Sequence, residues 1–379
     1  MTDNGVDTYF EACHLAFQDR PEAHRIALYI EHATRERGAS WPFYRLAAAC
    51  LDGGSISLWR QGVRIALTRA HDTPQCIDVR REALRRLGDW SGWQDVPWPT
   101  KGEDLPPTVD RWWDGSEDLS GKSLLVCDLG ALGDVIRSLR FAEALREKVS
   151  APIFWEVPQN LLEFVEYNLG HLPGMHAFNV ERTDAHFDRA LNGNLLPRLL
   201  GPLPPFVPRR APSPVTLERA NHARLGIAWA CSIGRLDHLE RSMPLRMLMP
   251  FFWRPDVEFY SLQVGTYAQE ASPFPRLRIP DPPLESFADT ANLIASLDGV
   301  ITVDTSVAHL AGSLGTPTLT LLPLPGDILW STADTTPWYP TMRFIRQRRT
   351  WDWLSVQARL KDALDARWWE TIPRVGSGS

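Results

Sequence analysis

The sequence lacks several features that define common classes of protein. No stretch approaches the roughly 20 apolar residues that a membrane-spanning helix needs, and the first residues show no positive region followed by an apolar core. The formal net charge of -6 provides no basic field for nucleic acid, and the arginines are scattered among acidic residues. We therefore expect a cytoplasmic protein with no transmembrane segment and no nucleic-acid partner.

Metal-binding patterns are also scarce. The five cysteines are odd in number, widely separated and never arranged as C-x-x-C, so neither a disulfide framework nor a cysteine-based zinc site is indicated. No Asp-x-Asp pair follows a predicted strand to hold a divalent ion. We expect a protein with no metal and no cofactor.

What is present indicates a large chain with several domains. With 379 residues, 44% of them hydrophobic, the chain can bury two substantial cores. Apolar residues recur at helical spacing over 56–67 and 79–87, with Gly88 as a C-terminal stop. We interpret 1–95 as a small all-α domain, although no fixed period proves a helical repeat.

Two alternating series of strands and helices follow. Strand, helix and strand at this spacing indicate parallel sheets covered by helices, so we predict an α/β fold of two Rossmann-like domains that face a crevice. The predicted strands are 123–127, 153–157, 225–229, 258–263, 299–303 and 318–322, and the predicted helices are 135–149, 244–252, 287–297, 306–314 and 354–369. The predicted boundaries are 96–212 and 213–350 for the two domains, 351–372 for a C-terminal helix that crosses back, and 373–379 for a tail.

The strongest candidate site follows the predicted strand 299–303. Asp304 ends the strand, Thr305 can cap the next helix and Ser306 begins it, so free backbone N–H groups and the helix dipole face the carboxyl edge of the sheet. Such a helix start binds anions, and the two hydroxyls suit a diphosphate. His309 lies one turn further along the same face. The alternative is an ordinary capped helix with a packed histidine.

A second candidate site follows the predicted strand 123–127. The sequence from Asp128 through Gly130 to Gly133 indicates a tight turn, and Asp134 then stands at the mouth of a helix. Its carboxylate could accept a proton from an acceptor hydroxyl, or it could only cap the helix. The glycine spacing is not G-x-G-x-x-G, so a nicotinamide cofactor gains little support.

Two further loops carry polar side chains after predicted strands. Arg235 and Arg241 could form paired hydrogen bonds to phosphate oxygens, and Gln263 could contact the edge of a base or a ribose. The alternatives are a solvated loop arginine and an ordinary turn residue.

Together these segments resemble the heptosyltransferase-type glycosyltransferases, most closely the bacterial branch in which that unit follows tetratricopeptide-like helices. The resemblance covers about 112–353 and rests on Trp112, Trp113, Asp114, Gly115, Leu119, Gly121, Gly133, Asp134, Ala228, Trp229, Ala230, Arg241, Ser242, Pro244, Leu245, Ser261, Gln263, Gly265, Phe287, Asp289, Thr290, Ala291, Asp304, Thr305, His309, Gly312, Pro337, Trp338, Tyr339 and Pro340. It implies a GT-B fold, inversion at the anomeric carbon, no metal, a nucleotide site in the C-terminal domain and an acceptor site in the N-terminal one.

The resemblance also assigns roles to residues. Asp134 matches the catalytic carboxylate of the family. The acceptor-side loop is Gly130, Gly133 and Arg137, and the donor-binding set is Trp229, Arg241, Gln263, Asp304, Thr305, Ser306 and His309. The sequence departs from its branch in the glycine turn 128–133 and in the loop 231–235, and both segments are expected at the crevice.

The expected function is therefore inverting, metal-independent transfer of a hexose or heptose from a nucleotide-sugar to a hydroxyl. Helical arrays present surfaces that suit polypeptides, so we predict a protein or peptide acceptor, with a glycan as the alternative. The helices could instead brace the catalytic part or contact a second copy of the chain. A nucleotide-sugar epimerase or hydrolase, and an inactive binding or scaffold protein, remain open as other functions.

Overall fold

The protein is described by a computed structural model. The described residues are 3–69, 73–94, 96–98, 105–127, 130–182, 185–217, 221–234 and 237–375. Asp128 and Arg235, singled out above, lie outside them, as do residues 376–379 of the tail. The chain forms two compact units, of which the first comprises Met1–Asp95, Leu322–Asp334 and Arg346–Val356, and the second comprises Val96–Leu321, Thr335–Ile345 and Gln357–Ser379.

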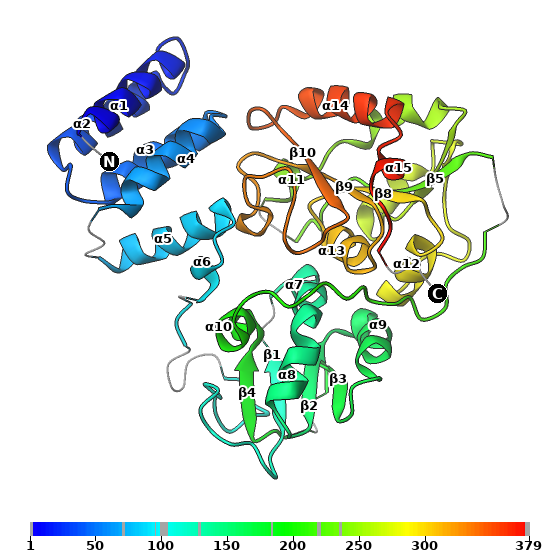
Figure 1. The fold of residues 1–379 in the computed structure, drawn as a ribbon. Helices are drawn as coiled ribbons and strands as arrows, with labels where there is room; N and C mark the ends of the chain where they lie inside the picture. Colours follow the sequence, from blue (N-terminus) through cyan, green and yellow to red (C-terminus); the bar gives the residue numbers. More distant parts are fainter. Residues whose placement is uncertain are drawn as a thin grey trace. The chain divides into compact units, whose positions relative to one another are not determined.

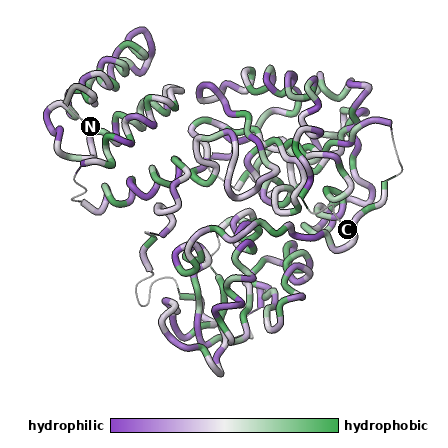
Figure 2. The backbone as a smooth tube through the Cα atoms, in the orientation of Figure 1, coloured by the Kyte–Doolittle hydropathy of each residue, from purple (hydrophilic) through white to green (hydrophobic). Residues whose placement is uncertain are grey.

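The first unit is built around a helical core. Its helices are α1 (Asp3–Phe17), α2 (Ala23–Arg35), α3 (Trp41–Asp52), α4 (Ile56–Leu67), α5 (Pro74–Leu87) and α6 (Ser91–Gln94). Hydrophilic and hydrophobic stretches alternate along them in Figure 2, and apolar side chains of α1 to α5 share one core. Gly88 ends α5 in the left-handed conformation, with φ at 79°, as its sequence position predicted.

A loop from outside the helices completes this core. Leu324, which follows strand β9 (Thr318–Leu322), is buried in the same apolar cluster as the helices. Arg60 donates to the hydroxyl and the carbonyl oxygen of Thr332 at 3.0 and 2.8 Å, and Arg86 donates to the carbonyl oxygen of Gly326 at 2.9 Å. The loop 322–334 is therefore fastened to α4 and α5.

The second unit contains two sheets of parallel strands (Figure 1). The first has the order β3-β2-β1-β4 and consists of β1 (Leu124–Cys127), β2 (Ile153–Val157), β3 (Met175–Asn179) and β4 (Arg189–Asn192). The second sheet has the order β10-β9-β8-β5-β6-β7. Besides β9, it contains β5 (Ala223–Ala228), β6 (Val257–Ser261), β7 (Leu277–Arg278), β8 (Gly299–Val303) and β10 (Met342–Arg346). The predicted α/β fold, with helices before the first strand, is confirmed.

The helices of the second unit follow the strands closely. They are α7 (Leu132–Ser138), α8 (Ala142–Lys148), α9 (Gln159–Leu169), α10 (Leu196–Leu200), α11 (His238–Arg241), α12 (Phe287–Ile294), α13 (Ser306–Ser313), α14 (Trp353–Asp365) and α15 (Trp368–Thr371). The predicted α-helix over 244–252 is wrong, because that segment forms two short 3-10 turns. Pro250 lacks the amide hydrogen that a continuous helix would need at this point.

The C-terminal helices attach to the half of the unit that carries the second sheet. Gln357 of α14 donates to the carbonyl oxygen of Met247, and Asp365 pairs with Arg254. That the segment 351–372 crosses back to the first Rossmann-like domain stays a prediction. The ring of Trp368 lies close to Gly299 at the start of β8, where an added Cβ would come within 3.0 Å of it.

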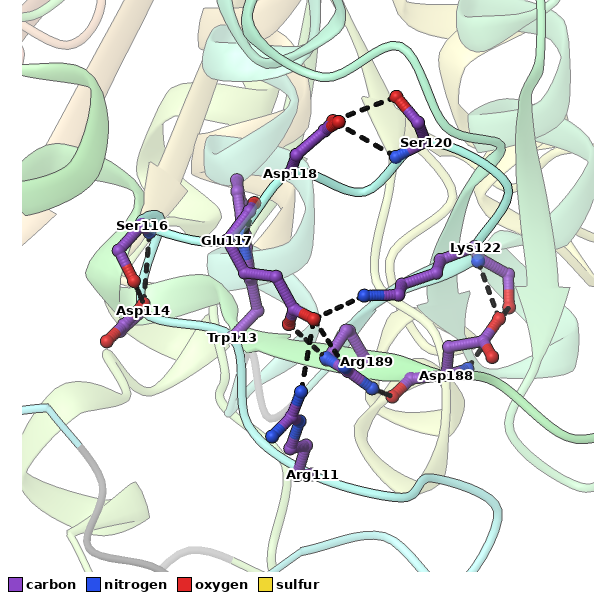
Figure 3. A network of polar contacts seen from close by, with 11 residues as sticks. Arg111, Trp113, Asp114, Ser116, Glu117, Asp118, Ser120, Lys122, Asp188 and Arg189 are labelled. Atoms are coloured by element: carbon purple, nitrogen blue, oxygen red, sulfur yellow. Dashed lines mark hydrogen bonds and ion pairs between the residues drawn. The ribbon is translucent and has the colours of Figure 1, made fainter.

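A charged network fastens the amino ends of the first sheet (Figure 3). Glu117 accepts hydrogen bonds from Arg189, at the start of β4, at 2.5 and 2.6 Å, and it also pairs with Lys122 and Arg111. The hydrogen bonds from Arg189, followed by that from Lys122, hold the pKa of Glu117 well below its usual range. Ligands of open α/β sheets bind at the opposite, carboxyl edge, so we assign this network to stability.

Candidate active site

The loop after β8 has the geometry that the sequence predicted. Thr305 caps α13, since its hydroxyl oxygen accepts from the backbone N–H of Val307 at 3.2 Å. Ser306 begins the helix and remains partly exposed. The eight-residue helix directs the positive end of its dipole toward this loop, which makes it a suitable seat for an anion.

Asp304 is buried and paired with Arg241. Only 2% of Asp304 is exposed, and Nη2 of Arg241 lies 2.9 Å from its carboxylate and 2.9 Å from its carbonyl oxygen. Asp237 lies 3.3 Å from the other terminal nitrogen of the guanidinium. Arg241 thus clamps the loop after β5 to the end of β8. Its predicted contact with phosphate stays a prediction.

Gln263 and Trp229 hold the start of that same loop. The side-chain oxygen of Gln263 accepts from the backbone amides of Trp229 and Ala230 at 3.0 and 2.9 Å. The buried indole of Trp229 donates to Glu270 at 2.9 Å. Both side chains fix the path of the chain as it leaves β5, and their predicted contacts with a donor remain to be tested.

Asp134 is the third residue of α7, at the carboxyl end of β1. Its carboxylate accepts from the backbone N–H of Ala131 at 3.2 Å and from Arg137 at 3.0 Å. Gly130, with φ at 78°, makes the tight turn before the helix. The side chain therefore supports its own helix start, and 34% of it is still exposed and accessible to an acceptor hydroxyl.

Arg137 orients this carboxylate from a buried position. Its guanidinium lies 4.7 Å from the centre of the Trp338 ring, within the range of a cation–π contact. The carbonyl oxygen of Trp338 in turn accepts from Arg140 at 2.8 Å. Trp338 therefore contacts both Arg137 and Arg140.

The packing of α7 against α13 brings the two predicted sites together. A Cβ added to Gly133 would lie 2.4 Å from Cδ2 of His309 and 2.9 Å from its Nε2, so the imidazole rests directly against the glycine. His309 is buried, with 7% exposed, and its Nδ1 lies 3.0 Å from the hydroxyl of Tyr339. Gly133 precedes Asp134, and the histidine follows the donor-side loop on α13. The first turns of α7 and α13, which follow strands of different sheets, therefore lie next to each other.

Sequence reasoning assigned no role to Trp338 or Tyr339. Both appeared only as part of the Pro-Trp-Tyr-Pro segment of the resemblance. The signal in the sequence is weak, because nothing in the spacing connects Tyr339 with His309 or Trp338 with Arg137.

The described part of the chain holds no group of three or more His, Cys, Asp or Glu side chains arranged to bind a metal ion. It also contains no helix with the length and apolar character needed to cross a bilayer.

Comparison with known proteins links the donor-side loop to a family. Residues 283–324 match the model of glycosyltransferase family 9 (heptosyltransferase). The matched segment includes α12, β8, α13 and β9, and with them Asp304, Thr305, Ser306 and His309. Over these residues, the match confirms the resemblance to heptosyltransferase-type glycosyltransferases that was stated from the sequence.

One curated relative and several solved structures are similar to this chain. Protein FlbA of Caulobacter vibrioides is 26% identical over 325 residues, which cover 74% of this chain and 53% of FlbA, so the chain spans about half the length of that relative. E. coli heptosyltransferase WaaC with ADP is 12% identical, with 63% of this chain and 99% of that one covered and a TM-score of 0.45. The glycosyl transferase family 9 protein of Veillonella parvula is 13% identical, with 65% and 91% covered and a TM-score of 0.45.

Proposed function

We propose that this chain is a glycosyltransferase of the heptosyltransferase type, which moves a hexose or heptose from a nucleotide-sugar to an acceptor hydroxyl with inversion and without a metal. The observation that carries the proposal is the contact between Gly133 and His309. It sets the helix that bears Asp134 beside the helix that follows the predicted donor loop. Both helices start after the carboxyl end of a parallel strand, which is where open α/β sheets bind ligands.

The proposed reaction is a single in-line displacement. The acceptor oxygen attacks the anomeric carbon from the face opposite the nucleotide. As the new C–O bond forms, the bond between that carbon and the phosphate oxygen breaks, and its electron pair leaves with the diphosphate. Asp134 accepts the proton of the acceptor hydroxyl, since its carboxylate is partly exposed at the start of α7.

The start of α13 is proposed to stabilise the departing diphosphate. The helix N-terminus supplies the positive end of a dipole, and the hydroxyls of Thr305 and Ser306 add hydrogen-bond donors. Preorganised groups of this kind can stabilise developing negative charge in place of a metal ion.

We further propose that the acceptor hydroxyl belongs to a polypeptide. Helical arrays present extended surfaces that suit a polypeptide better than a small sugar. The array of this chain also includes the loops 322–334 and 346–356, which begin at the ends of β9 and β10. A glycan carried by a lipid or a polysaccharide is the alternative acceptor.

A nucleotide-sugar screen followed by turnover tests the reaction. Thermal unfolding would be measured with ADP-, GDP-, UDP- and dTDP-sugars, because a ligand at 100 times its Kd stabilises the folded state by about 2.7 kcal/mol. With the donor identified, we expect turnover that needs an acceptor and persists after treatment with a chelator. Product formed without acceptor would indicate an epimerase or hydrolase, and binding without turnover would indicate a scaffold protein.

Mass spectrometry tests the acceptor class. The full chain and its donor would be incubated with a library of peptides that contain serine and threonine, and separately with lipid-linked and free glycans. The proposal predicts a sugar mass on the peptides at a side-chain hydroxyl. Transfer to glycans alone would overturn the polypeptide acceptor and leave the transferase activity standing.

A further inference from the structure

Tyr339 packs closely against His309. The hydroxyl of Tyr339 lies 3.0 Å from Nδ1 of His309, and the two rings are nearly perpendicular, at 77°. Gly312 lies one turn further along α13, and a Cβ there would come within 2.6 Å of the tyrosine ring. The missing side chain at this position makes room for the ring, so α13 itself fixes where the hydroxyl meets the imidazole.

The chemistry of the two groups favours one direction for this hydrogen bond, which depends on the tautomer of His309. Burial raises the pKa of Tyr339, with Arg137 acting against the rise and Asp134 adding to it, so the phenol keeps its proton at neutral pH. A neutral imidazole has one protonated and one unprotonated nitrogen, and the unprotonated nitrogen is a stronger base than a phenol oxygen. A phenol that donates to Nδ1 of a neutral imidazole leaves the ring proton on Nε2.

The Nε2 edge of the ring is the one that meets α7. Nε2 and Cδ2 of His309 are the atoms that an added Cβ at Gly133 would strike. Gly133 directly precedes Asp134, so Nε2 lies at the helix start that carries the proposed base.

We propose that Tyr339 is a positioning residue for sugar transfer, whose hydroxyl holds His309 in the Nε2-protonated tautomer so that the imidazole presents an N–H donor to the leaving diphosphate. The phosphate contact rests on the proposed function, whereas the tautomer does not. Trp338, the preceding residue, contacts Arg137, which orients Asp134. Two adjacent residues thus support the donor-side and acceptor-side groups at once.

Tyr339→Phe tests the proposal because it removes one oxygen and keeps the ring. Tyr167→Phe, at an exposed tyrosine of α9, is the matched control. The tautomer would be observed by ¹⁵N NMR of histidine-labelled protein, with the signals of His309 assigned by their loss in His309→Gln. We expect an unprotonated Nδ1 and a protonated Nε2 in the unsubstituted protein and in the control, and a mixture of tautomers in Tyr339→Phe.

The kinetic readout separates positioning from folding. We expect kcat to fall by about 10- to 100-fold in Tyr339→Phe, because a misdirected donor stabilises the transition state poorly, while the KM for the acceptor stays unchanged. Glutamine at position 309 carries its own N–H donor, so adding Tyr339→Phe to His309→Gln should lower kcat no further.

Four outcomes would overturn parts of the proposal. A protonated Nδ1 in the unsubstituted protein, or an unchanged tautomer in Tyr339→Phe, would overturn the assignment of the hydrogen bond. An unchanged kcat despite an altered tautomer would overturn the positioning role. If the unsubstituted protein transfers no sugar to any acceptor, the proposed function fails, and the NMR result alone decides the role of Tyr339 toward His309.

Discussion

At the scale of single residues, the site depends on glycines as much as on polar groups. Gly133 and Gly312 each lie where a Cβ would enter an aromatic ring, that of His309 in one case and that of Tyr339 in the other. From sequence alone, Gly133 was predictable as a turn residue. Its contact with His309 joins parts of the chain that are far apart in the sequence, and no local sequence pattern predicts such a contact.

Replacing Gly133 by alanine should therefore separate the two helix starts. The added methyl would lie 2.4 Å from Cδ2 of His309, so the ring or the helix must move. We expect sugar transfer to fall at least about tenfold and the free energy of unfolding to drop by about 1–3 kcal/mol, as overpacking usually costs. Enzyme assays and denaturant unfolding check both effects.

Gly38→Ala is the matched control for that substitution. A Cβ at this position meets no atom within 4 Å, so activity and stability should stay unchanged. Native turnover by Gly133→Ala would show that the contact between α7 and α13 is not required for transfer.

Other single residues show how far sequence reasoning reaches. Thr305 caps α13 as predicted, because a cap depends only on its immediate neighbours. The predicted phosphate contact of Arg241 stays a prediction, and the sequence did not indicate that its guanidinium pairs with the buried Asp304. That partner directly follows β8, so its proximity to Arg241 follows from the arrangement of the sheet and not from the loop sequence.

At the scale of elements, the sequence predicted the strands that are buried on both faces. Strands β8 and β9 are buried throughout, and they stand out in the sequence as apolar runs. The predicted elements did not include β3, β4, β7 and β10. Strand β3 alternates between buried and more exposed residues and includes His176, and β4 begins with Arg189, whose charge is balanced by the distant Glu117.

The ion pairs of Glu117 should make the first sheet sensitive to acid. The folded-state pKa of Glu117 is lowered by Arg189 first and Lys122 second, so its stabilising contribution is present above the unfolded pKa of about 4.3 and is lost as pH falls below that value. Glu117→Gln should lower the melting temperature most at neutral pH, and the difference from the unsubstituted protein should shrink at acidic pH.

Thermal unfolding between neutral and acidic pH measures this difference. Glu163→Gln removes an exposed carboxylate from α9 and serves as the control, with no effect expected at any pH. A difference for Glu117→Gln that stayed constant with pH would argue against an electrostatic origin.

At the scale of the whole molecule, the units do not follow simple stretches of sequence. The first unit combines the helices with the loops 322–334 and 346–356. A boundary placed by composition near residue 95 recognises the helical segment but not these loops. Leu324 lies more than 200 residues beyond the helices whose core it joins, so only the folded chain reveals it.

Leu324→Ala tests whether helices and loop form one cooperative unit. Leu324 is 2% exposed, so its truncation should lower the free energy of unfolding by about 2–5 kcal/mol. Hydrogen exchange should increase in α3 and α4 as well as in the loop. Leu354→Ala, at a leucine of the same unit that is 71% exposed, should change neither. Faster exchange confined to residues 322–334 would mean that the loop is only an attachment.

The most direct test of the account is the turnover of Asp134→Asn. Asparagine keeps the size of the side chain, and its oxygen can still accept from the backbone N–H of Ala131, so folding and donor binding should be retained. The kcat for transfer should fall by on the order of 10²- to 10⁴-fold, the usual contribution of a positioned base. The control Asp362→Asn, at an exposed carboxylate of α14, should behave as the unsubstituted enzyme. A near-native kcat in Asp134→Asn would contradict the account, because another group would then have to take the acceptor proton.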